Sequence, residues 1–168
     1  VDTIMLLPII NLGSAISTMV AQSKGAGEPQ RARHFWRTGA VMNLVVSLLL
    51  MAVMLLFGGK LVALFGVGPE AIIIAAAIGR RFFQRISLFY VFFGLANSMR
   101  GTIEGTGRVV YSSSVSIAAL LLRIALSYLL AAPFHNMAIP YAEGLHWIFM
   151  VLCFLPFFLR RDRWTQNS

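Results

Sequence analysis

Charged residues are scarce in this sequence, and acidic residues are the scarcest of them. Only 12% of the 168 residues are Asp, Glu, Lys or Arg, and only 6 are acidic. Soluble globular domains contain about 25% charged residues. A chain with so few charges cannot cover its surface with them. Together with a hydrophobic content of 58%, this excludes an ordinary soluble domain and indicates an integral membrane protein.

Cysteine and histidine are also rare, which argues against several kinds of chemical site. The single cysteine, Cys153, lies inside an apolar run, so no disulfide framework is expected. The three histidines are too scattered for metal-ligand spacing, and no metal or cofactor is expected. No strand precedes Gly101, Gly105 and Gly107, so these glycines lack the context of a phosphate-binding loop. Without a nucleophile–base set, an enzyme is not expected.

Long apolar runs make up most of the chain, and they predict an all-α membrane bundle of about five helices over residues 1–168. The expected spans cover residues 4–22, 39–57, 71–99, 109–132 and 139–159. The third is longer than a bilayer needs, and we place its Arg80, Arg81 and Arg85 at or near the outer surface of the membrane. We expect a basic loop from Ser23 to Thr38 after the first span. The segment "RGTIEGTGR" is expected to form the turn after the third span.

Basic residues gather on one side of the predicted membrane. The loop after the first span, the turn after the third and the tail at 160–168 contain nine of the 14 Lys and Arg residues, whereas Lys60 lies on the other side. Cytoplasmic loops carry the excess of Lys and Arg in membrane proteins. We therefore predict a multi-pass protein of the cell (inner or plasma) membrane with a cytoplasmic carboxy-terminus. Anionic membrane lipid explains the net charge of +8 better than nucleic acid does.

Four segments, in this order, resemble one known family. They are "VAQSKGAGEPQRARHFWRTG", "LVALFGVGPEAIIIAAAIGRRFFQRIS", "FFGLANSMRGTIEGTGRV" and "LLLRIALSYLLAAPF" followed by "EGLHW". The ordered set covers nearly the whole chain and resembles the carboxy-terminal half of the multidrug and toxic-compound extrusion (MATE) transporters, from the eighth to the twelfth span. Gln22, Gly25 and Gly27 match the basic loop motif of that family.

The resemblance implies half of a two-bundle secondary antiporter. Such transporters export drugs or other organic cations in exchange for protons or sodium ions, and both ions stay open here. The implied partners are a small organic cation and the amino-terminal half of the same transporter. A lipid-linked oligosaccharide or lipid flippase of the same superfamily is one alternative. A truncated membrane fragment without transport activity of its own is another.

Arg123 is the most distinctive candidate site residue, because it lies inside the apolar span 109–132. A charge at such a depth costs about 2.5 kcal/mol or more, and such residues usually face a bundle interior or a water-filled cavity. One interpretation is a cavity group that binds anions or orients a coupling carboxylate. The other is an arginine that binds backbone carbonyls at a helix break or extends to the membrane surface.

Coupling of transport to an ion would need an acidic residue within the membrane. The chain has only 6 acidic residues, and all of them map to loops or span ends. Some sodium-coupled members of the resembling family carry an acid within the tenth span, where this chain has aromatic residues from Phe89 to Phe93. Glu143, near the start of the last span, is the best local coupling candidate. The alternative is a carboxylate that stabilises a helix N-terminus.

Two further groups of candidate site residues lie in and just after the third span. Tyr90, Phe93 and Asn97 would suit a cavity for flat cations through cation–π contact, although aromatic residues in a span also serve simply in packing. Arg100 and Glu104 have the spacing of an ion pair on one helix face. We expect that pair at the cytoplasmic rim, with a structural role.

Overall fold

The computed structural model describes residues 2–64, 79–134 and 138–159, and nearly all of them are helical. This confirms the all-α prediction. The elements are α1 (Asp2–Gly25), α2 (Pro29–Leu64), the short 3-10 helix η1 (Ser87–Phe89), α4 (Tyr90–Gly105), α5 (Val109–Phe134) and α6 (Ala138–Leu159). Residues 79–86 are also helical and lead directly into η1.

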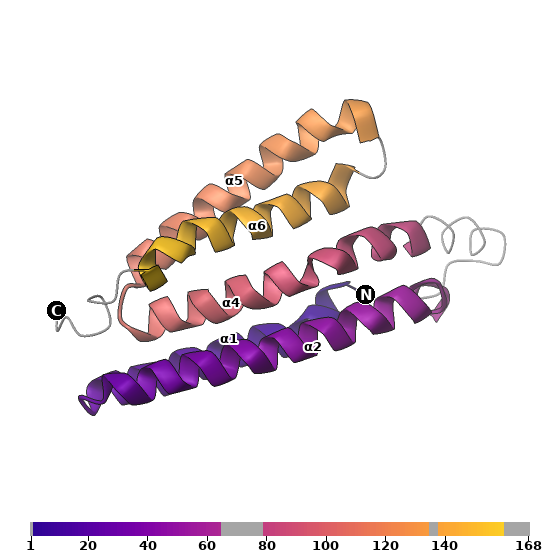
Figure 1. The fold of residues 1–168 in the computed structure, drawn as a ribbon. Coiled ribbons are helices and arrows are strands. Elements are labelled where there is room, and N and C mark those ends of the chain that lie inside the picture. Colours follow the sequence, from indigo (N-terminus) through magenta and orange to yellow (C-terminus); the bar gives the residue numbers. More distant parts are fainter. Residues whose placement is uncertain (1, 65–78, 135–137, 160–168) are drawn as a thin grey trace.

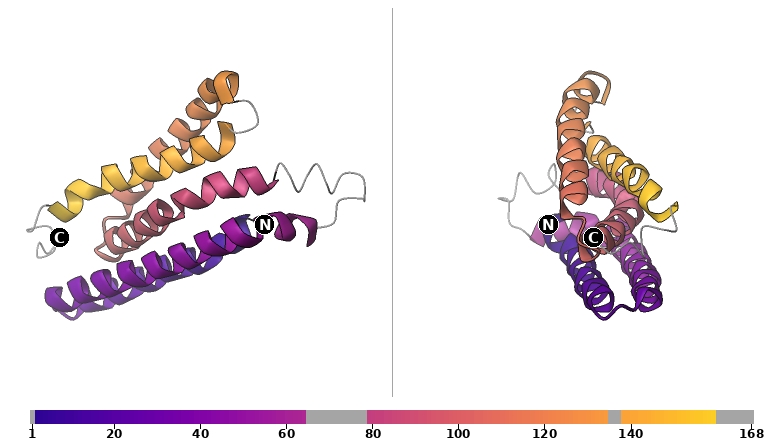
Figure 2. Two further views of the ribbon diagram at one scale, coloured as in Figure 1. Left: turned by 45° about the vertical axis from the view of Figure 1, so that its right-hand side comes forward. Right: turned by 90° about the vertical axis from the view of Figure 1, so that its left-hand side faces the viewer.

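The helices form two hairpins with α4 between them (Figure 1). One hairpin consists of α1 and α2, the other of α5 and α6, and α4 contacts all four of these helices. The α1–α2 turn, the α4–α5 turn and the end of α6 lie at the same end of the bundle, and α5 diverges from α4 toward the opposite end (Figure 2). The central position of α4 places its residues against both hairpins.

Four of the described helices are long and apolar enough to cross a membrane. They cover Thr3–Gly25, Pro29–Gly58, Val109–Phe134 and Ala138–Leu159. The span expected at 71–99 differs, because η1 interrupts it and its residues 71–78 lie outside the described residues. At this interruption the Phe89 ring packs so closely on Gly144 of α6 that an added Cβ there would lie 2.3 Å from it.

The interior consists of two apolar clusters that lie along α4. The cluster near the α1–α2 turn includes Ile16, Val20, Ile103, Phe154 and Phe157. The cluster toward the other end includes Ile9, Met54, Ile86, Tyr90 and Trp147. Many other large apolar side chains face outward, as expected of helices that contact lipid rather than water.

The prediction of a basic loop from Ser23 to Thr38 is wrong, because α2 already begins at Pro29. Gly27, with a φ of 71°, adopts the left-handed conformation that commonly ends a helix. Its N–H donates to the Lys24 carbonyl at 3.0 Å, and the Glu28 N–H donates to the Ser23 carbonyl at 2.9 Å. This Schellman pattern ends α1, and proline then suits the first turn of α2.

The turn expected over "RGTIEGTGR" is also shorter than predicted, because α4 continues to Gly105. Gly107, with a φ of 87°, repeats the Schellman pattern: its N–H donates to the Glu104 carbonyl at 2.9 Å, and the Arg108 N–H donates to the Ile103 carbonyl at 3.2 Å. Gly101 serves packing instead, since a Cβ there would lie 2.2 Å from the Gly13 carbonyl oxygen of α1.

Candidate functional site

Arg123 of α5 and Glu143 of α6 form an ion pair between two candidate membrane helices. The Arg123 Nη2 lies 3.2 Å from the Glu143 Oε1, and the side-chain exposures are 37% and 15%. Both helices belong to one antiparallel hairpin (Figure 1). The sequence indicated these two residues separately, and the hairpin brings them together. Each charge therefore offsets the cost of placing the other in an apolar surrounding.

The helix turn around Glu143 supplies further polar contacts. The His146 ring lies one turn later, with its Nδ1 2.8 Å from the Glu143 backbone carbonyl oxygen. Because a carbonyl oxygen only accepts, this contact assigns the proton to Nδ1. Two residues before Glu143, the Tyr141 hydroxyl accepts a hydrogen bond of 3.0 Å from Arg85 Nη1. The Arg85 guanidinium carbon also lies 5.4 Å from the centroid of the Tyr141 ring.

The three residues expected to line a cavity lie on α4. Tyr90 is fully buried, and its ring centroid lies 6.3 Å from that of Trp147. Phe93 is half-buried and packs on Trp147 at 4.9 Å. Asn97 lies against Gly13 of α1, where an added Cβ would be 3.2 Å from the Asn97 carbonyl oxygen. Tyr90 and Phe93 thus contact α6 one helical turn beyond Glu143.

Arg100 and Glu104 form the expected ion pair on α4, with Arg100 Nε 2.8 Å from Glu104 Oε1. The Ser112 hydroxyl of α5 donates to the same carboxylate oxygen at 2.9 Å. The two charged side chains are 44% and 27% exposed. This pair is local to α4 and more exposed than the pair between Arg123 and Glu143, and its additional contact joins α4 to α5.

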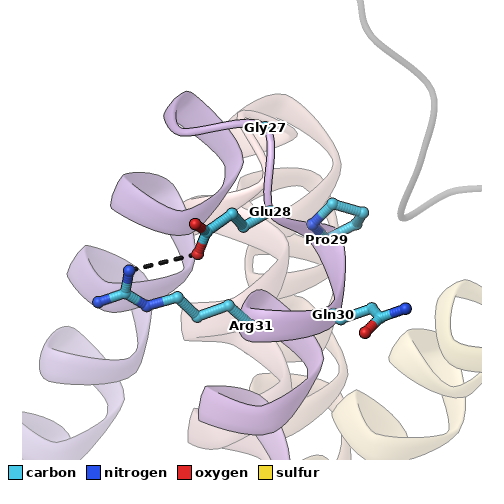
Figure 3. A pocket seen from close by; sticks show the side chains of 5 residues that line it. All are labelled: Gly27, Glu28, Pro29, Gln30 and Arg31. Carbon is cyan, nitrogen blue, oxygen red and sulfur yellow. Dashed lines mark hydrogen bonds and ion pairs between the residues drawn. The ribbon is translucent and has the colours of Figure 1, made fainter.

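The family loop motif lies at the α1–α2 turn. Gln22 and Gly25 are exposed near the end of α1, and Gly27 forms the turn. A shallow hollow of about 500 Å³ is lined by Gly27, Glu28, Pro29, Gln30 and Arg31 (Figure 3). Within it, Arg31 Nη1 lies 3.3 Å from Glu28 Oε2. The hollow is open to the outside, and its only close polar contact in the figure is this surface ion pair.

A buried polar cluster between α2 and α4 was not predicted. The Asn43 Nδ2 donates to the Ser98 Oγ at 2.7 Å, and the Ser98 hydroxyl donates to the Gly94 carbonyl at 2.9 Å. Asn43 and Ser47 are both fully buried. Among the described residues, Asn43 Oδ1 and Ser47 Oγ have no hydrogen-bond partner. Their spacing of four within an otherwise apolar run was the available sequence signal.

Within residues 2–64, 79–134 and 138–159, no group of three or more His, Cys, Asp or Glu side chains is arranged to hold a metal ion. Between α5 and α6, the Glu143 carboxylate instead pairs with the Arg123 guanidinium, and His146 lies on the next turn of α6.

Comparisons with known proteins identify relatives of one kind. The MatE family model matches residues 1–129. A probable multidrug resistance protein of Bacillus subtilis (strain 168), YoeA, is 30% identical over 115 residues, which are 68% of this chain and 24% of that protein. Another from the same organism, YpnP, is 27% identical over 164 residues, which are 97% of this chain and 36% of that protein.

The fold has a counterpart among solved structures. An inward-facing multidrug resistance MATE family transporter of the MOP superfamily matches with a TM-score of 0.83 and 17% identity, over 98% of this chain and 39% of that chain. The chain thus spans about a quarter to two fifths of the length of the relatives described here. Because the family model matches most of its residues, the chain belongs to the MATE family of multi-pass membrane proteins, homologous to part of a multidrug resistance transporter.

Proposed function

We propose that this chain forms the carboxy-terminal bundle of a secondary-active antiporter that exports drugs or other organic cations in exchange for protons or sodium ions. Two relatives that are named as probable multidrug resistance proteins support the substrate class. The observation that carries the coupling mechanism is the ion pair between Arg123 and Glu143. The partner in transport is the amino-terminal bundle, with the substrate site between the two bundles.

Coupling requires a group whose occupancy differs between the two facing states of the transporter. Glu143 meets this requirement, because a carboxylate binds either a guanidinium, a proton or a sodium ion. While Arg123 holds the carboxylate at 3.2 Å, α5 and α6 are joined at this level of the bundle. When a proton or sodium ion takes the carboxylate, the attraction weakens and the two helices are free to separate. The binding of the ion thereby favours one state over the other.

The proposal is tested by Glu143→Gln in the complete transporter, reconstituted in liposomes with an imposed proton or sodium gradient. Glutamine keeps the shape of the side chain but cannot bind an ion through a negative charge. Ethidium efflux should fall about tenfold or more, because without a carboxylate neither ion is able to shift the balance between the two facing states. Arg123→Ala should also abolish efflux while the protein still inserts.

Glu104→Gln is the matched control, since it removes a carboxylate that also pairs with an arginine but is more exposed. Its efflux should remain within about twofold of the unmodified protein, as exposed ion pairs contribute about 0–1 kcal/mol. The double variant Arg123→Gln/Glu143→Gln should accumulate normally, because no unpaired charge remains, and should still fail to couple. Gradient-driven efflux by the double variant at the normal rate would refute the proposed role.

A further inference from the structure

The first turns of α2 present a basic face at one end of the bundle. Gln30, Arg33, His34 and Arg37 line a shallow hollow of about 350 Å³, and their spacing of three and four residues places them on one side of the helix. These residues open the candidate membrane span Pro29–Gly58, whose 30 residues extend about 45 Å and so exceed the ~30 Å thickness of a hydrocarbon core. The basic face therefore lies where a spanning helix meets the headgroup region.

Arg31 belongs to the same helix but to a different surface. Its Nη1 lies 3.3 Å from Glu28 Oε2, and its guanidinium carbon lies 5.6 Å from the centroid of the Phe35 ring. In Figure 3 the side chains of Arg31 and Gln30 point to different sides of α2. Arg31 thus takes part in a surface ion pair and does not line the hollow that Arg33 and Arg37 line.

The basic face continues along α2 as an exposed apolar stripe. Val41, Leu44 and Leu48 follow Arg37 at helical spacing, and they are 60%, 42% and 44% exposed. Residues spaced by three or four lie on one face of a helix. One side of α2 therefore carries cationic groups at the membrane boundary and, in line with them, apolar side chains at the depth of the hydrocarbon.

We propose that this face binds an anionic phospholipid. The guanidinium groups of Arg33 and Arg37 bind the phosphate, to which arginine donates hydrogen bonds in a fixed fork, and Gln30 and His34 donate to the oxygens around it. The acyl chains lie along Val41, Leu44 and Leu48. A soluble anion would leave the apolar stripe without a role, whereas a phospholipid matches both parts in the order in which α2 presents them.

Native mass spectrometry of the complete protein in detergent provides the test, with phosphatidylglycerol and phosphatidylcholine of identical acyl chains as probes. Phosphatidylglycerol should bind about tenfold more tightly, in line with the attraction of juxtamembrane basic residues for anionic lipid. The variant Arg33→Gln/Arg37→Gln should lose most of this preference. Arg33→Lys/Arg37→Lys, which keeps the charge, should retain part of it.

Arg31→Gln is the matched control, because it removes the same charge from the other side of the helix. Its preference for phosphatidylglycerol should stay within about twofold of the unmodified protein. Far-ultraviolet circular dichroism should show equal helicity for all variants. Equal retention of the two lipids by the unmodified protein would overturn the proposal, as would an equal loss in the Arg31 variant. Displacement of the lipid by free glycerol phosphate at equal concentration would also overturn it, because the acyl chains would then contribute nothing.

Discussion

At the scale of single residues, the same pair of side-chain types serves in two different surroundings. Arg100 and Glu104 meet on one helix and are partly exposed, so their separation is inexpensive. Arg123 and Glu143 come from two helices, and Glu143 is only 15% exposed. Removal of one member of the second pair leaves a charge that the apolar surroundings do not stabilise. Surroundings, rather than residue type, distinguish the more exposed pair from the candidate coupling site.

Ser47 gives a prediction at this scale. Its hydroxyl is fully buried and has no hydrogen-bond partner among the described residues, and such a group costs about 1–3 kcal/mol. Ser47→Ala should therefore leave the thermal unfolding temperature in detergent unchanged or raise it. Asn43→Ala is the comparison, because it removes the bond to Ser98 and should lower that temperature. A larger fall of the unfolding temperature in the Ser47 variant than in the Asn43 variant would contradict this prediction.

At the scale of elements, two turns of the same construction lie at one end of the bundle. Both end a helix in a Schellman pattern with a left-handed glycine, Gly27 or Gly107. The Lys24 Nζ donates to the Thr106 carbonyl at 2.8 Å, which joins the first turn region to the second. α1 and α4 then run side by side, and Gly13 and Gly101 allow their backbones to approach closely. Membrane helices commonly pack through small residues at such crossings.

Gly101→Ala should separate α1 from α4. The added Cβ would lie 2.2 Å from the Gly13 carbonyl oxygen, which is backbone and unable to rotate away, and overpacking of this kind costs about 1–3 kcal/mol or more. We expect a lower unfolding temperature in detergent. Gly25→Ala is the control, because an added Cβ there meets no atom within 4 Å. It should be neutral or slightly stabilising, since alanine favours helix. Equal stability of the two variants would rule out close packing at Gly101.

At the scale of the whole molecule, the arrangement of the ends bears on orientation in the membrane. The α1–α2 turn, the α4–α5 turn and the end of α6 share one end of the bundle (Figure 1). The basic residues of the sequence are concentrated in these segments or in the segments that follow them. Lys60 lies near the far end of α2. The orientation predicted from charge therefore requires only that the end of the bundle with the α1–α2 turn face the cytoplasm.

Cysteine labelling in intact cells tests this orientation. After replacement of Cys153 by serine, single cysteines at the exposed positions Ala26 and Lys60 report the two ends of α2. A membrane-impermeant maleimide should label the Lys60→Cys protein from outside and should label the Ala26→Cys protein only after the membrane is opened. The reverse pattern would invert the predicted topology, and with it the cytoplasmic assignment of the carboxy-terminus.

The sequence by itself determined the class of protein, the helical fold and the family. These follow from properties that are read along the chain: the length of apolar runs, the positions of Lys and Arg, and the order of short motifs. It also indicated Arg123 and Glu143, each as an isolated charge. The pair between Arg100 and Glu104 was predictable because residues four apart share a helix face.

Only the tertiary structure decided which of these residues meet. Arg123 reaches Glu143 because α5 and α6 fold back on one another, and Asn43 reaches Ser98 because α2 packs on α4. The turns are shorter than expected because the left-handed Gly27 and Gly107 lie two residues after the ends of α1 and α4, and the next helix begins two residues later. The arginines assigned to a loop at 31, 33 and 37 therefore belong to α2. Contacts between helices depend on rotation and register, and a hydrophobic pattern leaves both open when outward-facing residues are also apolar.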